Sequence, residues 1–367
     1  MTTPTPKRTP DEFDRRFAAA ALRLGAGALG STWPNPSVGA IIVKNQMVVG
    51  RGVTGKGGRP HGETAALDMA VDAAAGATLY VSLEPCAHHG KTPPCTDAIQ
   101  AAGIERVVAP RADPDPRVAG KGFGRLREAG IDVLTGVLEK AAARVQAGHI
   151  SRVERSRPHV MLKLAVSADD AIGRRGERQV PISGEVARRH VQALRSRFDA
   201  ILVGRGTIEA DDPRLTCRLP GLEGRSPVRV VLDSDNRLAA GSNVFDGNAP
   251  TWIFGTNGED KSTPSLRRFK AARAGGGLDV AACLARLAGE GITRLLVEGG
   301  ARVARSFLEA DLVDEIMLFR SPIALGGDVV PALAGLPLSL VEASERFRRT
   351  ERRTFGADRM SRYERVR

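Results

Sequence analysis

The chain has 367 residues, which is more than one ordinary hydrophobic core requires, so we expect two domains. Hydrophobic residues make up 42% and charged residues 26%, the composition of an ordinary globular protein, and no apolar run is long enough to span a membrane. The formal net charge of +12 is spread along the chain, and aromatic residues, at 4%, are too few for a base-stacking platform. We therefore expect phosphorylated small molecules as ligands, and neither nucleic acid nor a membrane as a partner.

The first part of the chain alternates helical and strand patterns. We predict helices at 11–29, 64–75, 95–102 and 121–129, with strands at 40–43, 47–49, 77–83, 104–109 and 131–135. A glycine-rich loop over 50–60 leads to His61. Such alternation indicates a layered α/β domain in which helices cover a sheet. An Ala-rich helix beginning near residue 140 then runs into the charged stretch 151–158, where we place the domain boundary.

A second α/β series follows this boundary. We predict strands at 159–166, 200–204, 228–232, 251–255, 293–297 and 313–319, a closing strand near 358–366, and helices at 185–197, 279–289 and 301–309. The compartment is predicted from the N-terminus, Met-Thr-Thr-Pro-Thr-Pro-Lys-Arg, which lacks the apolar core of a signal peptide. Among four cysteines, Cys217 and Cys283 are isolated in sequence, and this usage fits a reducing compartment. We expect a cytoplasmic protein.

The stretch from His61 to Cys95 has the residues of a catalytic zinc site. Catalytic zinc is held by three protein ligands, and the fourth position is left for water. His61, Cys86 and Cys95 supply one imidazole and two thiolates. Glu63 is not needed as a ligand and is free to move protons, which is the arrangement of zinc-dependent nucleobase deaminases. A closed structural site is the alternative, because His88 or His89 could supply a fourth ligand.

Two glycine-containing stretches stand out in the second half of the chain. The segment 297–303, Val-Glu-Gly-Gly-Ala-Arg-Val, places two glycines between a strand and a helix, where backbone amides and the helix dipole favour a pyrophosphate. The segment 203–207, Val-Gly-Arg-Gly-Thr, is a predicted loop after a strand and is followed by Asp211 and Asp212. Either stretch could instead be only a tight turn or a solvated loop.

These patterns together resemble one enzyme family over nearly the whole chain, the bifunctional riboflavin-biosynthesis deaminase/reductases. The matching stretches are Pro34-Asn-Pro-Ser-Val-Gly-Ala-Ile-Ile-Val, Pro60-His-Gly-Glu, Leu83-Glu-Pro-Cys-Ala-His-His-Gly-Lys-Thr-Pro-Pro-Cys, Asp113-Pro-Asp-Pro, Leu162-Lys-Leu-Ala-Val-Ser, Ala210-Asp-Asp-Pro-Arg-Leu-Thr and Val297-Glu-Gly-Gly. The long loop between the two cysteines separates this family from cytidine and tRNA-adenosine deaminases. The resemblance implies a cytidine-deaminase-like three-layer α/β domain over 1–150 and a dihydrofolate-reductase-like domain over 151–367.

The resemblance also implies two reactions in sequence. The first domain would use zinc to deaminate 2,5-diamino-6-ribosylamino-4(3H)-pyrimidinone 5′-phosphate by hydrolysis. The second would use NADPH to reduce the ribosyl side chain to ribityl, giving 5-amino-6-ribitylamino-uracil 5′-phosphate. Both the substrate and the cofactor are phosphorylated, which suits the basic charge balance. The family further suggests a homo-oligomer assembled through the reductase half.

Site residues are carried over from the family by position. In the deaminase, Asn35 would hold the pyrimidine, and His88 and Lys91 would reach the ribose or the phosphate. In the reductase, Lys163 and Glu298 would lie near the carbon that accepts hydride, and Glu298 would also contact substrate. The remaining substrate contacts would come from Arg195, Leu215 and Arg218. The residues implied in NADPH binding are Ala165, Thr207, Asp211, Ser234, Gly300, Ala301, Arg302, Val303, Ala304, Arg305 and Ser306.

The chain departs from the family pattern at several positions. Gly62 replaces the usual alanine of His-Ala-Glu, a small change that we expect to be tolerated. Thr54 replaces a histidine that could contact phosphate or sugar, and Asp115 stands where asparagine is common. After Ser167 the usual Leu-Asp-Gly reads Ala-Asp-Asp, with Asp170 in the place of glycine.

Two other functions compete with a bifunctional riboflavin enzyme. A nucleic-acid deaminase with an appended domain would have the same metal chemistry, and it would show salt-sensitive RNA binding and indifference to NADPH. A zinc-stabilised binding protein that has lost catalysis would hold a fourth protein ligand on zinc. In that protein, neither half would turn over substrate.

Overall fold

The computed structural model describes residues 9–178, 180–257 and 263–366, and it divides into two compact units, Met1–Arg155 and Ser156–Arg367. The polar N-terminal segment 1–8 lies outside the described residues. A boundary after residue 150 falls inside helix α6 (Ala147–Arg155), and the units divide at the end of that helix. Among the described residues, no helix has the length and apolar character needed to cross a bilayer.

The first unit is built on a five-stranded sheet with the order β2-β1-β3-β4-β5. Its strands are β1 (Gly39–Lys44), β2 (Met47–Val53), β3 (Thr78–Val81), β4 (Arg106–Ala109) and β5 (Asp132–Thr135). Strand β1 is antiparallel to both neighbours, while β3, β4 and β5 are parallel. As a result, the start of β1 and the ends of β2, β3 and β4 lie at the same end of the sheet.

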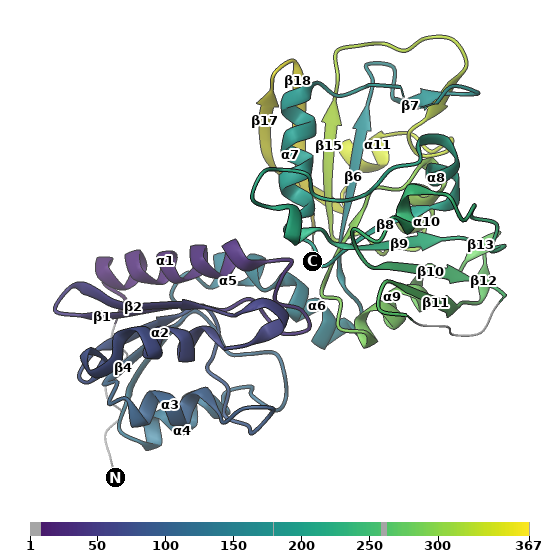
Figure 1. The fold of residues 1–367 in the computed structure, drawn as a ribbon. Helices are drawn as coiled ribbons and strands as arrows, with labels where there is room; N and C mark the ends of the chain where they lie inside the picture. Colours follow the sequence, from purple (N-terminus) through teal and green to yellow (C-terminus); the bar gives the residue numbers. More distant parts are fainter. Residues whose placement is uncertain (1–8, 179, 258–262, 367) are drawn as a thin grey trace. The chain divides into compact units, whose positions relative to one another are not determined.

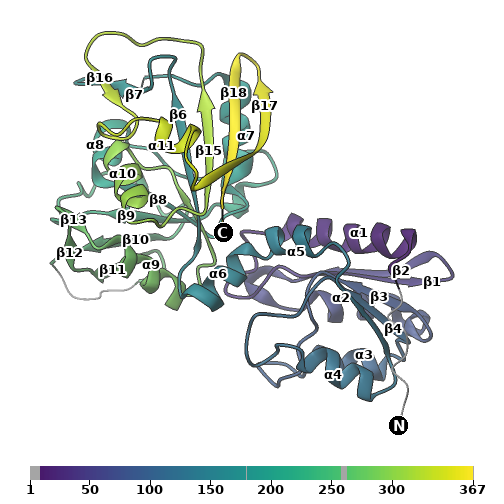
Figure 2. The same ribbon diagram turned by 180° about the vertical axis from the view of Figure 1, so that it is seen from behind.

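Helices cover both faces of this sheet, which gives the three layers visible in Figures 1 and 2. The helices are α1 (Glu12–Ala28), α2 (Gly62–Ala70), α3 (Cys95–Ala101), α4 (Lys121–Glu128) and α5 (Glu139–Val145). One core joins α1 to side chains such as Ile41 and Tyr80. The other core joins α2, α3 and α4 to the opposite face, where Ile42 and Leu79 point. The alternation of neighbouring strand residues between the two cores is the expected two-residue period.

Helix α2 packs unusually close to strand β2 because glycines line the contact. A Cβ atom at Gly52 would lie 2.2 Å from the carbonyl oxygen of Gly62, and one at Gly50 would lie 2.3 Å from that of Ala66. The prediction that 50–60 is entirely loop is therefore wrong: β2 continues to Val53, since these glycines are strand residues that receive the helix. Helix α2 also ends earlier than predicted, at Ala70, because Val71 adopts a left-handed backbone with φ of 49°.

The second unit contains a nine-stranded sheet with the order β11-β10-β9-β8-β14-β6-β15-β18-β17. Its strands are β6 (His159–Val166), β8 (Ala200–Gly204), β9 (Val228–Leu232), β10 (Thr251–Gly255), β11 (Leu266–Lys270), β14 (Arg294–Val297), β15 (Glu315–Arg320), β17 (Phe347–Phe355) and β18 (Asp358–Arg365). All are parallel from β11 to β15, and β18 and β17 add an antiparallel hairpin.

The helices of this unit are α7 (Glu185–Arg195), α8 (Arg205–Asp211), α9 (Val280–Gly289), α10 (Ala301–Glu309) and α11 (Ser339–Glu342). Two small antiparallel pairs join β7 (Ala171–Arg174) to β16 (Val329–Pro331) and β12 (Arg273–Ala274) to β13 (Gly277–Leu278). The crossovers β6–α7–β8 and β14–α10–β15 run in opposite directions along the sheet. Right-handed crossovers therefore place α7 and α10 on opposite faces, which explains why β8 and β14 are buried on both sides.

Candidate active sites

The three predicted zinc ligands come together at the end of the first sheet where β1 starts and β2, β3 and β4 end. His61 is the residue before helix α2, Cys86 follows β3, and Cys95 is the first residue of α3. Their ligand atoms all lie within 4.8 Å of one another, with His61 Nδ1 3.2 Å from Cys95 Sγ and 3.7 Å from Cys86 Sγ. One imidazole and two sulfurs at such spacing fit a tetrahedral zinc ion with one open position. In the part of the chain that the structure describes, neither His88 nor His89 belongs to this group.

Glu63 lies beside this cluster and is outside the ligand group. Its side chain is buried, and burial together with the nearby Cys86 charge raises the pKa of Glu63 to about 7. The hydrogen bonds with Cys95 and, to a lesser extent, with His61 lower the pKa of Cys86 to about 4 despite burial. Cys86 can therefore be a thiolate at neutral pH, and thiolate is the form that binds metal. Glu63 combines an enclosed carboxyl with a pKa near neutrality, which suits a group that both takes and gives protons.

The loop between the two cysteines carries the other residues implied for the deaminase. His88 is partly buried, and its Nδ1 is enclosed with no hydrogen-bond partner among the described residues. Lys91 is exposed. Arg59, which precedes the zinc ligand His61 by two residues, donates to Thr92 of this loop. On the neighbouring loop before β1, the side-chain amide of Asn35 donates to the Gly58 carbonyl at 3.0 Å. Asn35 is thus at the same sheet edge as the ligand cluster.

Two departures from the family pattern are structurally linked. Thr54 is buried, and its hydroxyl accepts a 2.9 Å hydrogen bond from the Val38 amide, while the Thr54 amide donates to the Val38 carbonyl. A Cβ atom on Gly62 would lie only 2.4 Å from that carbonyl oxygen. An alanine at this position, as the family usually has, would therefore require the start of α2 and the Val38 carbonyl to move apart, and Gly62 permits the closer approach seen here. Asp115 forms a salt bridge with Arg117, whose hydrogen bond lowers the pKa of Asp115 to about 2.

Sequence reasoning missed Glu84, the residue two before Cys86. Its buried carboxylate accepts three backbone hydrogen bonds, at 3.0 Å from Asp113, 2.9 Å from Gly120 and 3.0 Å from Phe123. Three N–H donors offset the cost of burying the charge of this carboxylate and hold it in one position. The signal was present in the sequence as the acid of Glu-Pro-Cys, but its partners lie 29 to 39 residues away.

In the second unit, Lys163 in the middle of β6 lies beside Glu298, the residue that follows the neighbouring strand β14. Lys163 Nζ is 3.8 Å from Glu298 Oε2. Glu298 is held more tightly by Arg195, whose Nε and Nη2 donate to its two oxygens at 2.8 and 3.0 Å. Burial lowers the pKa of Lys163, and the Arg195 charge adds to this effect. Although burial opposes ionisation of Glu298, the charges of Arg195 and Lys163 together lower the pKa of Glu298. The bidentate Arg195 contact could not be predicted from sequence.

The other residues implied in substrate binding surround this group. Arg195 Nη1 donates to the Thr216 carbonyl at 3.3 Å, and the Arg218 amide donates to Gln192 at 3.0 Å, so helix α7 holds the loop at both points. Leu215 in this loop is buried and has a left-handed backbone with φ of 55°. The loop is therefore fixed against the same helix that supplies Arg195.

The residues implied in cofactor binding follow the carboxyl ends of neighbouring strands. The prediction of a loop over 203–207 is wrong from Arg205 onward, because α8 begins there and buries Ile208. Thr207 on α8 accepts a 3.0 Å hydrogen bond from the Gly300 amide at the start of α10. The following amides, from Ala301 to Val303, belong to the first turn of α10, where helix amides have no partner within the helix and attract anions.

The remaining members of that set lie around α8, β6 and α10. Ala165 is partly buried on β6, on the same side of the strand as Lys163, and Asp211 is exposed as the last residue of α8. Arg305 points away from the start of α10, since it pairs with Glu309 and with the Ala334 carbonyl. Ser306 bonds back to Arg302 within the helix. Ala304 is buried, so the first turn is the part of this range that presents polar groups.

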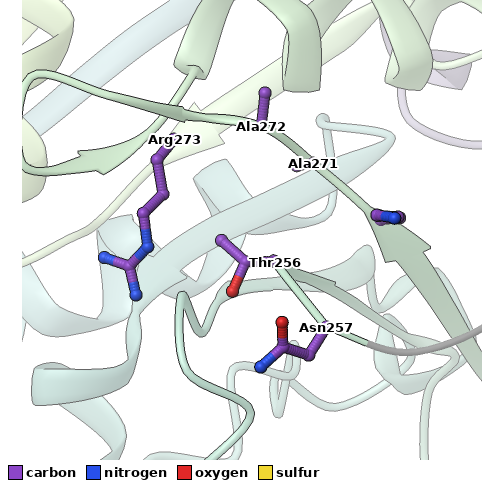
Figure 3. Close-up of a pocket in the computed structure, with 6 residues that line it drawn as sticks. Thr256, Asn257, Ala271, Ala272 and Arg273 are labelled. Carbon is purple, nitrogen blue, oxygen red and sulfur yellow. The ribbon is translucent and has the colours of Figure 1, made fainter.

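Ser234 follows β9 and leads to a hollow at the same edge of the sheet. The Ser234 carbonyl accepts hydrogen bonds from the amide and the hydroxyl of Thr256. Thr256 lines a hollow of about 530 Å³ at the ends of β10 and β11, whose other lining residues are Asn257, Lys270, Ala271, Ala272 and Arg273. Figure 3 shows Thr256, Asn257 and Arg273 at its border. Arg273 and Arg237 both contact Asp235, and their hydrogen bonds lower the pKa of that carboxyl.

Asp170, which stands where the family has glycine, keeps a glycine-like conformation with φ of 60°. Aspartate tolerates the left-handed region better than most residues. Its carboxylate lies 2.5 Å from Arg320. The neighbouring Asp169 accepts backbone hydrogen bonds from Leu325 and Gly326 at 3.0 and 2.8 Å. The altered segment therefore retains an ordered turn.

Family models match each unit. The cytidine and deoxycytidylate deaminase zinc-binding region matches residues 11–110, and the RibD C-terminal domain matches residues 158–359. The folds and sites thus define a two-part enzyme, a zinc-binding deaminase joined to a reductase that uses a nicotinamide cofactor.

Relatives of known name share this organisation. The riboflavin biosynthesis protein RibD of Escherichia coli is 38% identical over 358 residues, covering 94% of this chain and 97% of the relative. That of Bacillus amyloliquefaciens is 41% identical over 331 residues, covering 88% of each chain. The chain belongs to the riboflavin biosynthesis protein RibD family. It is a bifunctional enzyme of riboflavin biosynthesis, and the predicted family is confirmed.

Solved structures agree with this assignment. The RibD of Acinetobacter baumannii has a TM-score of 0.86 and 31% identity, with 97% of this chain and 99% of that chain covered. A Thermotoga maritima diaminohydroxyphosphoribosylaminopyrimidine deaminase/5-amino-6-(5-phosphoribosylamino)uracil reductase also has a TM-score of 0.86, with 34% identity and coverage of 96% and 99%. The predicted fold class, a deaminase-like domain followed by a reductase-like domain, is confirmed.

Proposed function

We propose that the first unit deaminates 2,5-diamino-6-ribosylamino-4(3H)-pyrimidinone 5′-phosphate and that the second unit reduces the ribosyl side chain of the product with NADPH. The observation that carries the proposal is the combination of two clusters in one chain. The first is the His61, Cys86 and Cys95 ligand set with buried Glu63 beside it. The second is Lys163 and Arg195 around Glu298.

In the deamination, water replaces the exocyclic amine on the ring, and ammonia leaves. Zinc held by the three ligands would supply a nucleophilic hydroxide near neutral pH. Glu63 would take a proton from the incoming water and pass protons to the ring nitrogen and then to the departing amine. Burial raises the pKa of this carboxyl, which favours a group that both takes and gives protons. Asn35 would hold the pyrimidine, and His88 and Lys91 would face the ribose phosphate.

In the reduction, hydride from NADPH would reach the former sugar carbonyl carbon, in its open-chain imine form, and a proton would reach the nitrogen. Lys163, whose pKa burial lowers, is suited to supply that proton. Glu298, ionised beside Arg195, would stabilise the cationic imine. Arg195, Leu215 and Arg218 would contact the substrate. The cofactor pyrophosphate would lie on the first turn of α10, with Thr207 fixing that turn through Gly300.

The proposed cofactor extends along the sheet edge from Lys163 and Ala165, past Asp211 and Ser234. Strand order supports such a path, because β6, β14, β8 and β9 are consecutive neighbours. The preference for NADPH over NADH is supported by the basic side chains of Lys270 and Arg273, which line the hollow next to Ser234. A phosphate group on the adenosine ribose would meet positive charge there.

The experiment that tests this function separates the two reactions. The purified protein is given the diaminopyrimidine ribosyl phosphate, and ammonia release and NADPH oxidation are followed independently. Chelation of zinc should abolish ammonia release, while reduction of supplied deaminated substrate continues. Zinc-loaded protein that releases no ammonia, or that consumes no NADPH with the deaminated substrate, would refute the corresponding half of the proposal. NADH in place of NADPH tests the cofactor preference.

A further inference from the structure

Helix α6 and the residue before it place three polar side chains on one face. Gln146, His149 and Arg152 are spaced three residues apart, and residues at this spacing are neighbours on a helix surface. Gln146 and His149 are buried, with 1% and 8% of their surface exposed. Polar side chains are buried to this degree when they have partners to hold, so the partners of this face indicate what it does.

Two of the three side chains hold the loop of Asn35. Gln146 Nε2 donates to the Ser37 carbonyl at 2.9 Å, and Arg152 Nη1 donates to the Pro34 carbonyl at 3.0 Å. These carbonyls lie on either side of Asn35. Asn35 itself is anchored by its side chain to Gly58. The segment 34–37 is therefore fixed at both ends by this helix face, and its central amide is fixed by a different loop.

The third side chain holds the loop that follows β4. His149 Nε2 lies 2.8 Å from Asp113 Oδ1, and the same oxygen accepts a hydrogen bond from the Asp115 amide at 2.8 Å. The Asp113 amide in turn donates to Glu84, two residues before Cys86. One helix face is thus bonded on one side to the segment that carries Asn35 and on the other to the network that supports a zinc ligand.

We propose that Gln146, His149 and Arg152 are positioning residues of the deaminase site, which set the placement of Asn35 relative to the zinc ligands. The inference rests on the proposed deamination. It implies that the functional deaminase extends through Arg155, because a chain cut after residue 150 would lose Arg152 and break α6. The hydrogen bonds of the three go to the Ser37 and Pro34 carbonyls and to Asp113, so their effect on the substrate is transmitted through these groups.

The test uses the full chain with side chains of similar shape that cannot make these bonds. Gln146→Leu and Arg152→Met remove the donors to Ser37 and Pro34, and Arg152→Lys restores a cationic donor. Lys140→Met on α5 is the matched control, since Lys140 is exposed. A lost hydrogen bond of this kind is worth roughly a factor of ten. We expect the deaminase KM to rise roughly tenfold in Gln146→Leu and in Arg152→Met, with smaller changes in kcat.

The accompanying measurements distinguish positioning from general support. Zinc content and NADPH oxidation with deaminated substrate should stay at the wild-type level, and Arg152→Lys should recover part of the KM. An unchanged KM, or a parallel loss of zinc and of reductase activity, would overturn the inference.

A readout without turnover keeps the inference separate from the proposed function. Amide hydrogen exchange should accelerate over residues 32–38 in Gln146→Leu and Arg152→Met, and over 113–120 in His149→Ala, but not in Lys140→Met. Unchanged exchange in these segments refutes the inference whether or not the wild-type protein releases ammonia. Faster exchange with an inactive wild-type protein would support the positioning role and refute the substrate.

Discussion

The two candidate sites assemble their reactive groups in different ways. In the first unit, the predicted metal ligands lie at the starts of helices α2 and α3 and in the loop after β3, within 34 residues of one another in sequence. In the second unit, Lys163, Arg195 and Glu298 come from segments up to 135 residues apart. The first site is a local motif placed on a scaffold, whereas the second exists only once a parallel sheet has formed.

The two sites also differ in the source of their charge, which is the proposed metal ion in one and protein side chains in the other. Around Glu63 the side chains are an imidazole and two thiols that could hold a metal ion, and the proposed deamination depends on that cation. Around Glu298 the charges belong to the protein itself, and one carboxylate is balanced against Lys163 and Arg195. Removing one group from either site should therefore abolish the reaction of that site and leave the other reaction intact. The loss of activity should be greatest at Glu63, because this one carboxyl is proposed to make every proton transfer of its reaction.

The largest expected effect is on Glu63. Glu63→Gln keeps the shape of the side chain but removes the carboxyl that exchanges protons, so deamination should fall by about 100- to 10,000-fold. Ammonia release measures this loss. Zinc content and reduction of deaminated substrate should remain at the wild-type level. Retention of most of the ammonia release would show that another group moves the protons.

Lys163 gives the reciprocal test. Lys163→Met removes the proposed proton donor and leaves the Arg195–Glu298 pair in place, so NADPH oxidation should fall by about 100-fold. Ammonia release should be unaffected, and Lys140→Met again provides an exposed-lysine control. Equal loss of both reactions in Lys163→Met would contradict the independence of the two sites.

A backbone contact should matter next. In Gly52→Ala the new Cβ would meet the Gly62 carbonyl at 2.2 Å and displace the helix that follows His61, at a cost of about 3 kcal/mol in the free energy of unfolding. Zinc content and ammonia release should fall together. Gly27→Ala is the control, because its Cβ would meet nothing within 4 Å and alanine favours a helix. Equal stability of the two variants would disprove the close-packing argument.

The smallest effect concerns the pH dependence of the first unit. Although burial opposes its ionisation, two hydrogen bonds from Arg106 at 2.9 and 3.0 Å help lower the pKa of Asp14 below its usual value. A lowered folded-state pKa stabilises the fold above the unfolded pKa of about 4, and this contribution is lost as pH falls through the folded value. Asp14→Asn should reduce stability at neutral pH by about 1.5 kcal/mol. The difference from wild type should shrink in acid, measured by urea unfolding at several pH values.

Much of the fold was predictable where hydrophobic runs are continuous. The predicted strands 200–204, 228–232 and 251–255 coincide with β8, β9 and β10, and helix 301–309 coincides with α10. Strand β17, by contrast, was missed because its sequence, Phe-Arg-Arg-Thr-Glu-Arg-Arg-Thr-Phe, is mostly charged and exposed at the sheet edge. Such a strand is held by backbone pairing with β18, and pairing leaves little trace in side-chain pattern.

The sequence by itself determined the enzyme family and predicted the metal ligands and the nearby acid, because zinc chemistry needs particular residue types at short range and those types stand in one recognisable stretch. Only the tertiary structure decided that Arg195 binds Glu298 through two hydrogen bonds, that Glu84 accepts hydrogen bonds from three distant amides, and that the Val38 carbonyl approaches Gly62 closely. These features depend on where separate segments meet. Hydrogen bonds and close contacts between segments are set by the packing of the sheets and helices, and a linear pattern of residue types does not contain them.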